Sequence, residues 1–314
     1  MAFDAETAQN VEVSVKLPPE LPPLEQLALM ERYTEAHRAG EGQPKEAREL
    51  ACLRVLYPAL LRSIEPEDLI AGRLDFLPIG FGCVTSVGGV GHYCVFRKLR
   101  AFKEQLPEEA HARVDALYDY WLDHDLKTKY CKDALKDDVV GMFIDCDYPL
   151  IATARLSGMM LDYRTLLSLG IGGLRARIEA LRSENGDSAF YRACLGCLDL
   201  FGTCCDALAA KAERAMEGAD AARRAELMRM RDALLAIREA APTTFFEALQ
   251  LFWLYALLAG VINYGRMDDV LGPFLQRDLD EGRLTEDEAF RLLFLKQCAA
   301  LGDCLPRLFE QVDD

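Results

Sequence analysis

Two charged residues that follow the most apolar stretch of the sequence are the first candidates for chemistry. Arg266 and Asp268 stand two positions apart in NYGRMDDVLGPF, which begins at Asn263 soon after the run FFEALQLFWLYALLAGVI. In an extended segment, residues two apart point to the same side, and an unpaired charge at the end of a buried element is costly. The pair therefore either clamps neighbouring helices together or faces a polar ligand in a pocket, and the residues leave both interpretations open.

Four cysteines fall in one segment, YRACLGCLDLFGTCCDALAAKAERA. Cys194 and Cys197 form a CxxC pair, and Cys204 and Cys205 follow it. Such pairs can bind zinc or exchange disulfides, but this segment predicts one continuous helix over residues 187–217 with no histidine nearby. Four thiolates along one helix cannot surround a metal. We therefore expect small core residues that pack helix against helix.

The four histidines are scattered along the chain, and no HExxH, HxxxH or GxSxG motif supports a zinc protease or a serine hydrolase. His111 and His124 lie in charged helical sequence and are expected to face solvent. His92 stands near the end of the glycine-rich stretch at 78–93, PIGFGCVTSVGGVGHY, where glycines permit sharp turns. A buried irregular loop is the favoured interpretation, and a pocket wall with His92 facing inward is the alternative.

The overall composition narrows the class of protein. The 314 residues include 51 acidic and 36 basic ones, a formal charge of −15 that disfavours nucleic-acid and anionic-membrane partners. Eleven cysteines are an odd number, and the start, MAFDAETAQN, has no apolar core of a signal peptide. We therefore expect a cytoplasmic protein with reduced thiols, whose longest apolar run is a buried core helix rather than a membrane span.

The spacing of apolar residues predicts a mostly helical chain with short strands. Residues 1–22 are acidic and proline-rich, and are expected to be extended or mobile. Capping boxes are expected at Thr244 with Glu247 and at Thr285 with Glu288. Helices are expected over 24–37, from 45 to about 60, over 97–121, over 162–182 with a break at 170–173, over 187–217, over 221–239 and from 242. Short strands are expected near 69–72, 141–151 and 261–265.

Two long segments of the sequence resemble a known protein family. PTTFFEALQLFWLYAL followed by NYGRMDDVLGPFLQRDLDEGRLTEDEAFRLL is similar to the pyruvate formate-lyase family of glycyl radical enzymes, strongly from Asp162 onward and weakly before it. The resemblance implies a fold that is the N-terminal portion of an α/β barrel, an incomplete half-barrel wrapped by helices. It also implies that a separate radical S-adenosylmethionine activase installs a glycyl radical on the protein, with no other cofactor bound. The radical then passes to a cysteine that attacks the substrate inside a barrel that excludes water and oxygen.

The sequence also departs from the family. It has no RVxGY-like glycine loop, and Cys298 and Cys304 follow the GRMD segment too closely to be the catalytic thiol. Residues 1–314 are therefore expected to be the N-terminal part of a pyruvate formate-lyase domain, a lyase, dehydratase or formate C-acetyltransferase of anaerobic metabolism, inactive without its C-terminal part. The expected partners are a small-molecule substrate, the remaining polypeptide, an activating enzyme or a second copy. A non-catalytic remnant or scaffold with the same fold is the alternative.

The resemblance further implies which side chains reach the substrate. Asn263, Met267 and Asp268 are candidates on the GRMD segment, with Arg266 as an orienting partner.

A second wall is implied before the DY motif, in ATARLSGMMLDY. Gly158 stands where relatives often carry a histidine, which disfavours a diol or hydroxyproline dehydratase. Nearby Arg155 would suit a carboxylate substrate through its guanidinium fork, with a surface or capping role as an equal alternative. Asp147 and Tyr148 are weaker candidates.

Overall fold

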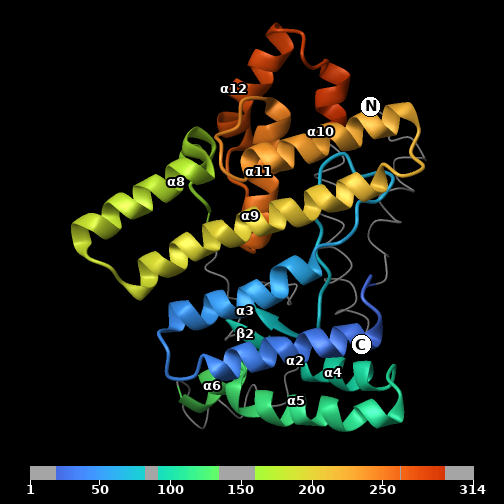
Figure 1. The fold of residues 1–314 in the computed structure, drawn as a ribbon, viewed down its shortest axis with the longest axis vertical. Helices are drawn as coiled ribbons and strands as arrows, with labels where there is room; N and C mark the ends of the chain where they lie inside the picture. The colour runs from blue at the N-terminus through green and yellow to red at the C-terminus, as the bar shows by residue number, and fades with distance from the viewer. Residues whose placement is uncertain (1–18, 82–90, 134–159, 262, 294–314) are drawn as a thin grey trace.

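The computed structural model describes residues 19–81, 91–133, 160–261 and 263–293, and in these residues the chain is mostly helical (Figure 1). This confirms the helical class predicted from the sequence. The elements in chain order are α2 Pro23–Ala39, α3 Lys45–Leu60, β1 Ile79–Phe81, β2 His92–Cys94, α4 Phe96–Lys103, the short 3-10 helix η1 Glu108–Ala110, α5 His111–His124, α6 Leu126–Asp133, α8 Tyr163–Asn185, α9 Ala189–Ala215, α10 Ala221–Ile237, α11 Phe245–Leu258 and α12 Met267–Asp280.

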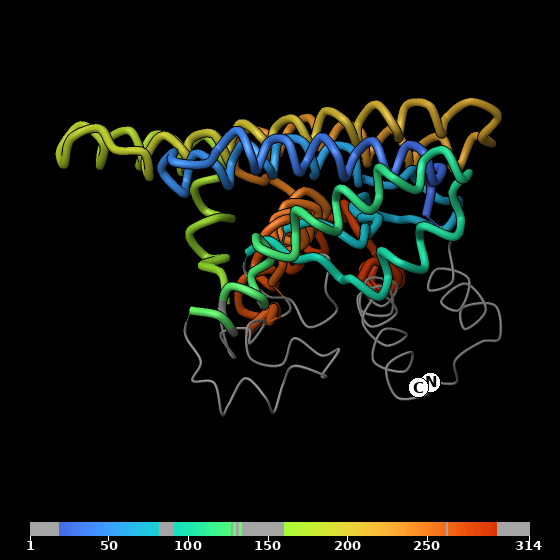
Figure 2. The backbone as a smooth tube through the Cα atoms, turned by 90° about the horizontal axis from the view of Figure 1, so that it is seen from below, coloured from blue at the N-terminus to red at the C-terminus, as the bar shows by residue number. Residues whose placement is uncertain are grey.

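The long helices form a layer. α3 packs between α2 and α9, and α9 packs between α3 and α10. Figure 2 shows these helices lying side by side at one face, with α11, α12, α4 and α5 beneath them. α11 packs against α10, α8 and α12, so it occupies the interior of this part of the molecule.

α9 is the central helix of the layer, and it is continuous over the CxxC segment, as the sequence predicts. Cys204 and Cys205 are fully buried in the core, where burial raises the pKa of the Cys204 thiol to about 12. Cys197 is exposed and Cys194 is half-buried. The core-packing prediction is thus confirmed for the second pair, whereas the first lies toward the surface. In the part of the chain that the structure describes, no group of three or more His, Cys, Asp or Glu side chains is arranged so that it could hold a metal ion.

α11 begins with the predicted capping box, in which Thr244 and Glu247 bond to each other's backbone. The amide of the fully buried Gln250 pairs with both backbone groups of Ala71, at 2.8 and 2.9 Å, and Trp253 Nε1 donates to the Gly72 carbonyl at 2.7 Å. The strand expected at 69–72 is therefore wrong. The side chains of α11, rather than a neighbouring strand, satisfy the backbone of that segment.

Among the described helices, only α9 is long and apolar enough to cross a membrane. In its most apolar 18-residue segment, 56% of the residues are buried inside the fold. A buried core helix passes the same test, so the finding carries little weight. α11, the longest apolar run of the sequence, has 14 residues and is buried along most of its length, as predicted.

Two helix interruptions have clear causes. The helix predicted over 97–121 divides into α4 and α5, because Pro107 lacks a backbone N–H and starts a new turn at η1. α8 bends at Gly170, within the predicted break, where φ is +63°. A Cβ there would lie 2.4 Å from the backbone nitrogen of Ala241, so the bend brings the chain close to the α10–α11 connection.

The remaining strand predictions have mixed outcomes. The glycine-rich stretch at 78–93 forms an antiparallel pair at its ends, β1 and β2, with Gly80 opposite Tyr93. An irregular loop is thus the wrong interpretation for these ends. Near 261–265 the structure has a single parallel bridge between Asn263 and Met160 instead of a strand. The strand predicted at 141–151, most of 1–22, Cys298 and Cys304 lie outside the described residues.

Candidate active site

The GRMD segment connects α11 to α12. Tyr57 of α3 donates a hydrogen bond to the carbonyl of Leu258, the last residue of α11, at 2.7 Å. The chain then turns, and Gly265 adopts a φ of +58° directly before the N-cap residue Arg266. A Cβ at residue 265 would lie 2.0 Å from the sulfur of Met160. The positive φ therefore favours glycine here, and a larger residue would also have to displace the exposed side chain of Met160.

Asn263 and Met160 bring two distant parts of the chain together. Their parallel bridge joins the segment after α11 to the residues that lead into α8. Both residues are exposed, and Met160 retains 54% of its surface. The Asn263 Oδ1 accepts a hydrogen bond from the backbone N–H of Gly265 at 3.0 Å. The amide nitrogen of Asn263 forms no hydrogen bond within the described residues, so it remains available as a donor.

Arg266 and Asp268 form a bidentate ion pair, in which Nε and Nη2 of the guanidinium donate to the two carboxylate oxygens at 2.8 and 2.5 Å. These hydrogen bonds, and the charge of Arg266, lower the pKa of Asp268 to about 2. The side chains are 79% and 66% exposed. The expected extended segment at the end of a buried element is therefore wrong: Asp268 lies in the first turn of α12, and the pair closes over the helix start in solvent.

Neither Arg266 nor Asp268 forms the clamp between helices that was one of the two predicted roles of this pair. Asp269 of α12 forms an ion pair with Arg164 of α8. Arg266 is thus free of any bond to a neighbouring helix in the described residues, and its Nη1 has no hydrogen-bond partner there. The polar side chains of residues 263–268 are exposed to solvent at the surface of the described structure.

An aromatic floor lies under this polar segment. Tyr264 contacts the rings of Phe252 and Trp253 in α11, and Met267 packs against the core. Tyr163 stacks on Phe252 with ring centroids 4.1 Å apart, and burial raises the pKa of its hydroxyl. Sequence reasoning missed both tyrosines, although each stands in a quoted motif, DY and NYGR.

His92 lies in a different part of the fold, among residues of α2, α3 and α5. Its Nδ1 is 2.6 Å from the hydroxyl of Tyr33, and its Nε2 is 2.6 Å from a carboxylate oxygen of Glu49. Its side chain is 6% exposed. His92 therefore faces inward, as the alternative interpretation states, but both ring nitrogens already have protein partners.

Three of the four histidines meet at this place, which sequence reasoning missed. The ring of His37 lies 4.4 Å from that of His92 and 5.8 Å from that of His124. His124 stacks on Tyr120 at 4.0 Å, and His111 is half-buried, so neither is the solvent-facing side chain that was expected. Burial, together with nearby positive groups, lowers the pKa of His37 to about 3. The three come from α2, β2 and α5, which no local sequence pattern connects.

Three further candidates, Arg155, Asp147 and Tyr148, lie outside the described residues, as does Gly158. The structure therefore leaves their roles as predictions.

Comparison with known proteins assigns the family. A family model described as "Pyruvate formate lyase-like" matches residues 5–295. The chain belongs to the pyruvate formate lyase-like family. This confirms the resemblance inferred from the GRMD segment and the apolar helix before it.

Curated relatives of this pyruvate formate lyase-like chain include lyases and dehydratases. It is 26% identical over 307 residues to isethionate sulfite-lyase of Nitratidesulfovibrio vulgaris, covering 86% of this chain and 36% of that protein. It is 28% identical over 293 residues to (2S)-3-sulfopropanediol dehydratase of Klebsiella oxytoca, covering 83% and 34%. The chain thus spans about a third of the length of the curated relatives it matches.

Solved structures of the family share the fold of this pyruvate formate lyase-like chain. A structure that describes 1,2-propanediol dehydration in Roseburia inulinivorans matches with a TM-score of 0.74 and 24% identity, covering 96% of this chain and 40% of the other. A glycyl radical enzyme from Archaeoglobus fulgidus matches with a TM-score of 0.70 and 22% identity, covering 93% and 39%. Glycyl radical enzymes carry their radical on the protein itself.

Proposed function

We propose that this chain forms part of the reaction chamber of a glycyl radical lyase or dehydratase. The match to the family over residues 5–295 carries the proposal. Residues 1–314 would provide the N-terminal part of the barrel domain, an incomplete half-barrel wrapped by the helices described above. The cysteine that attacks the substrate and the glycine that stores the radical would lie on polypeptide outside these 314 residues, and this chain alone would be inactive.

The geometry of the 263–268 segment supports a binding role for a small polar substrate. Because two guanidinium nitrogens of Arg266 are held by Asp268, the third nitrogen is oriented and available as a charge-assisted donor. The amide nitrogen of Asn263 is a second donor on the same short segment. Two fixed donors suit a hydroxyl, sulfonate or carboxylate oxygen. Asp268 would thus act mainly by positioning Arg266.

The apolar side chains of the segment would define the shape of the site. Met267 packs on the core next to the two donors, and Met160 lies beside Asn263 across the bridge. A substrate held between donors and thioethers would present its carbon skeleton to the apolar side. Fixed placement of the reacting carbon is the contribution that a protein makes to radical chemistry.

The other candidates would form a second wall of the chamber. We assign Arg155 the recognition of a carboxylate, with Asp147 and Tyr148 as neighbouring polar residues. His92, whose ring nitrogens are bound to Tyr33 and Glu49, would support a wall rather than donate to the substrate.

The proposed setting is an anaerobic cytoplasm. A radical S-adenosylmethionine activase would install the glycyl radical, and the remaining polypeptide or a second copy of this chain would close the barrel. No nucleic acid, membrane or further cofactor is part of the proposal.

Reconstitution tests this function directly. The DNA downstream is searched for a frame with a cysteine loop and an RVxGY-like glycine loop, and its product is produced with this chain and activated without oxygen. We expect a glycyl radical doublet by electron paramagnetic resonance only in the assembly. Turnover is then assayed with isethionate, 3-sulfopropanediol, propane-1,2-diol, glycerol and trans-4-hydroxy-L-proline.

Variants of the GRMD segment test its role. Asp268→Asn should lower kcat/KM about ten- to hundredfold, as expected for the loss of a hydrogen bond to a charged group, and leave the radical signal unchanged. Asp269→Asn is the matched control, because Asp269 pairs with Arg164 instead. Unchanged turnover in Asp268→Asn would refute the binding role. A chain that associates with no such product and forms no radical would support the alternative, a non-catalytic remnant or scaffold with the same fold.

A further inference from the structure

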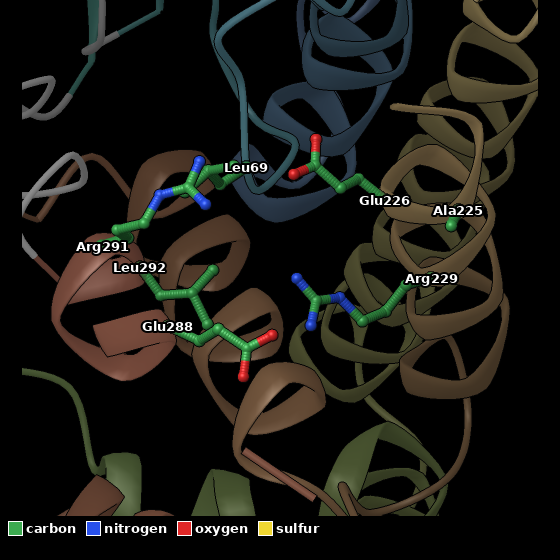
Figure 3. Close-up of a pocket in the computed structure, with 7 residues that line it drawn as sticks. All are labelled: Leu69, Ala225, Glu226, Arg229, Glu288, Arg291 and Leu292. Atoms are coloured by element: carbon green, nitrogen blue, oxygen red, sulfur yellow. The ribbon is translucent and has the colours of Figure 1, made fainter. Parts of the chain in front are cut away.

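A cavity of about 290 Å³ lies between α10 and the helical residues 286–293. None of the residues assigned to the substrate lines it. Figure 3 shows its charged wall residues: Glu226 and Arg229 come from α10, and Glu288 and Arg291 lie opposite them. Leu69 and Leu292 contribute apolar surface. The cavity is therefore a charged hollow with an apolar edge, independent of the GRMD segment.

The two carboxylates of this cavity already have partners inside the chain. Glu288 accepts hydrogen bonds from the N–H and hydroxyl of Thr285, both at 2.9 Å, in the predicted capping box. Glu226 accepts from Arg223 at 2.8 Å. Each glutamate therefore has an anchor that is independent of the arginines in the cavity.

The two arginines differ from the glutamates in this respect. Neither Arg229 nor Arg291 forms an ion pair or a hydrogen bond within the described residues. The guanidinium of Arg229 lies 4.4 Å from the ring centroid of Phe246, a cation–π contact that fixes its position and leaves its N–H groups free. Both arginines are near enough to Glu288 to contribute to the lowering of its pKa, after the larger effect of the Thr285 hydrogen bonds. Two guanidinium groups thus line one small cavity, and their N–H groups have no acceptor within the described residues.

We propose that this cavity binds a small tetrahedral oxyanion, phosphate or a phosphoryl group. A guanidinium fork fits two oxygens of such a group, and two forks from opposite walls can engage a dianion. The volume is at the lower end for ligand pockets, which favours a small phosphorylated compound over a nucleotide. Glu226 and Glu288 oppose anions in general, so only a ligand that engages both arginines overcomes their repulsion.

Titration of the full 314-residue chain with inorganic phosphate tests this site. Calorimetry at constant ionic strength, with sodium chloride as the balancing salt, separates binding from screening. We expect saturable binding with a Kd of about 1 mM or tighter. Arg229→Gln and Arg291→Gln should each weaken it about tenfold, whereas Glu226→Gln should tighten it severalfold. Arg231→Gln is the matched control, because Arg231 lies on the same helix but pairs with Asp232; its binding should equal that of the parent chain.

Titration with further ligands shows whether the cavity binds free phosphate or the phosphoryl group of a metabolite. Tighter binding of glycerol 3-phosphate than of phosphate would point to a phosphorylated metabolite, and equal binding to free phosphate. Succinate, a dianion of different shape, should bind more weakly than phosphate. The proposal is overturned by absence of saturable binding, by equal losses in the Arg231→Gln control, or by succinate binding as tightly as phosphate. Circular dichroism of each variant shows that the fold is retained, and no outcome depends on radical activity.

Discussion

Two arginine–aspartate pairs in this protein use the same chemistry in opposite surroundings. Arg62 and Asp75 form a pair whose side chains are 9% and 6% exposed, whereas the side chains of Arg266 and Asp268 are mostly exposed. Asp75 also accepts a hydrogen bond from the N–H of Glu20 at 2.8 Å. The buried pair is therefore bonded to a distant part of its own chain, whereas within the described residues no side chain of another element bonds to the exposed pair.

The difference between the pairs indicates which charged residues are available for a ligand. Around Arg62 and Asp75 the backbone is fixed as well, since Arg62 and Asp75 donate their N–H groups to Arg73 and Leu60. A buried pair of this kind holds a connection in place, away from any ligand in solvent. The Arg266–Asp268 pair is bidentate and exposed, and it leaves one guanidinium nitrogen unused in the described residues.

Breaking the buried pair should have the largest effect on stability. Asp75→Asn leaves the guanidinium of Arg62 buried without its counter-charge, and should lower the free energy of unfolding by about 3–5 kcal/mol, measured by urea denaturation. A double variant, Arg62→Met with Asp75→Leu, should recover much of that loss because it removes both charges. A loss below about 1 kcal/mol in Asp75→Asn would show that the pair is not the buried structural contact described here.

An intermediate effect is expected from the buried histidines. The folded-state pKa of His37 is about 3, below the ordinary 6.5, so the unfolded chain binds the extra proton between these values. The contribution of His37 is fully present above pH 6.5 and is lost as the pH falls toward 3. Between pH 6.5 and 5 it should cost about 2 kcal/mol of unfolding free energy. His37→Gln should flatten this part of the stability profile, and the half-buried His111→Gln should leave it steep. Identical profiles for the two variants would contradict the assignment.

The smallest effect on stability is expected at the exposed pair. Asp268→Asn should leave the free energy of unfolding nearly unchanged, because exposed ion pairs contribute little to stability. The same variant should impair turnover in the assembled enzyme, as proposed above. Urea denaturation of Asp268→Asn and Asp75→Asn under the same conditions measures the difference between their free energies of unfolding. If Asp268→Asn were as destabilising as Asp75→Asn, the open position of residues 263–268 would be wrong.

Much of the local structure follows from the sequence. The expected start of α10 at Ala221, the capping boxes at Thr244 and Thr285, and the break of α8 near Gly170 agree with the structure. Each of these features depends on residues three or four positions apart or on the conformation of a single glycine. Neighbouring residues in the sequence are therefore enough to predict it. The family resemblance rests likewise on contiguous segments.

The failed predictions involve contacts over long distances in the chain. A short strand was predicted at residues 69–72, but the side chain of Gln250 in α11 bonds to the backbone groups of Ala71, 179 positions away. The Arg266–Asp268 pair was expected at the end of a buried element, yet the helix that begins at Met267 places it in solvent.

The sequence by itself determined most of the long helices, several of their caps and the family of this chain, because hydrophobic periodicity and hydrogen bonds near each residue decide them. Tertiary structure alone decided which polar residues are buried, which histidines meet, and which guanidinium groups keep free donors. Those properties depend on how much water is excluded from each side chain, and that exclusion arises only when segments far apart in the chain pack together.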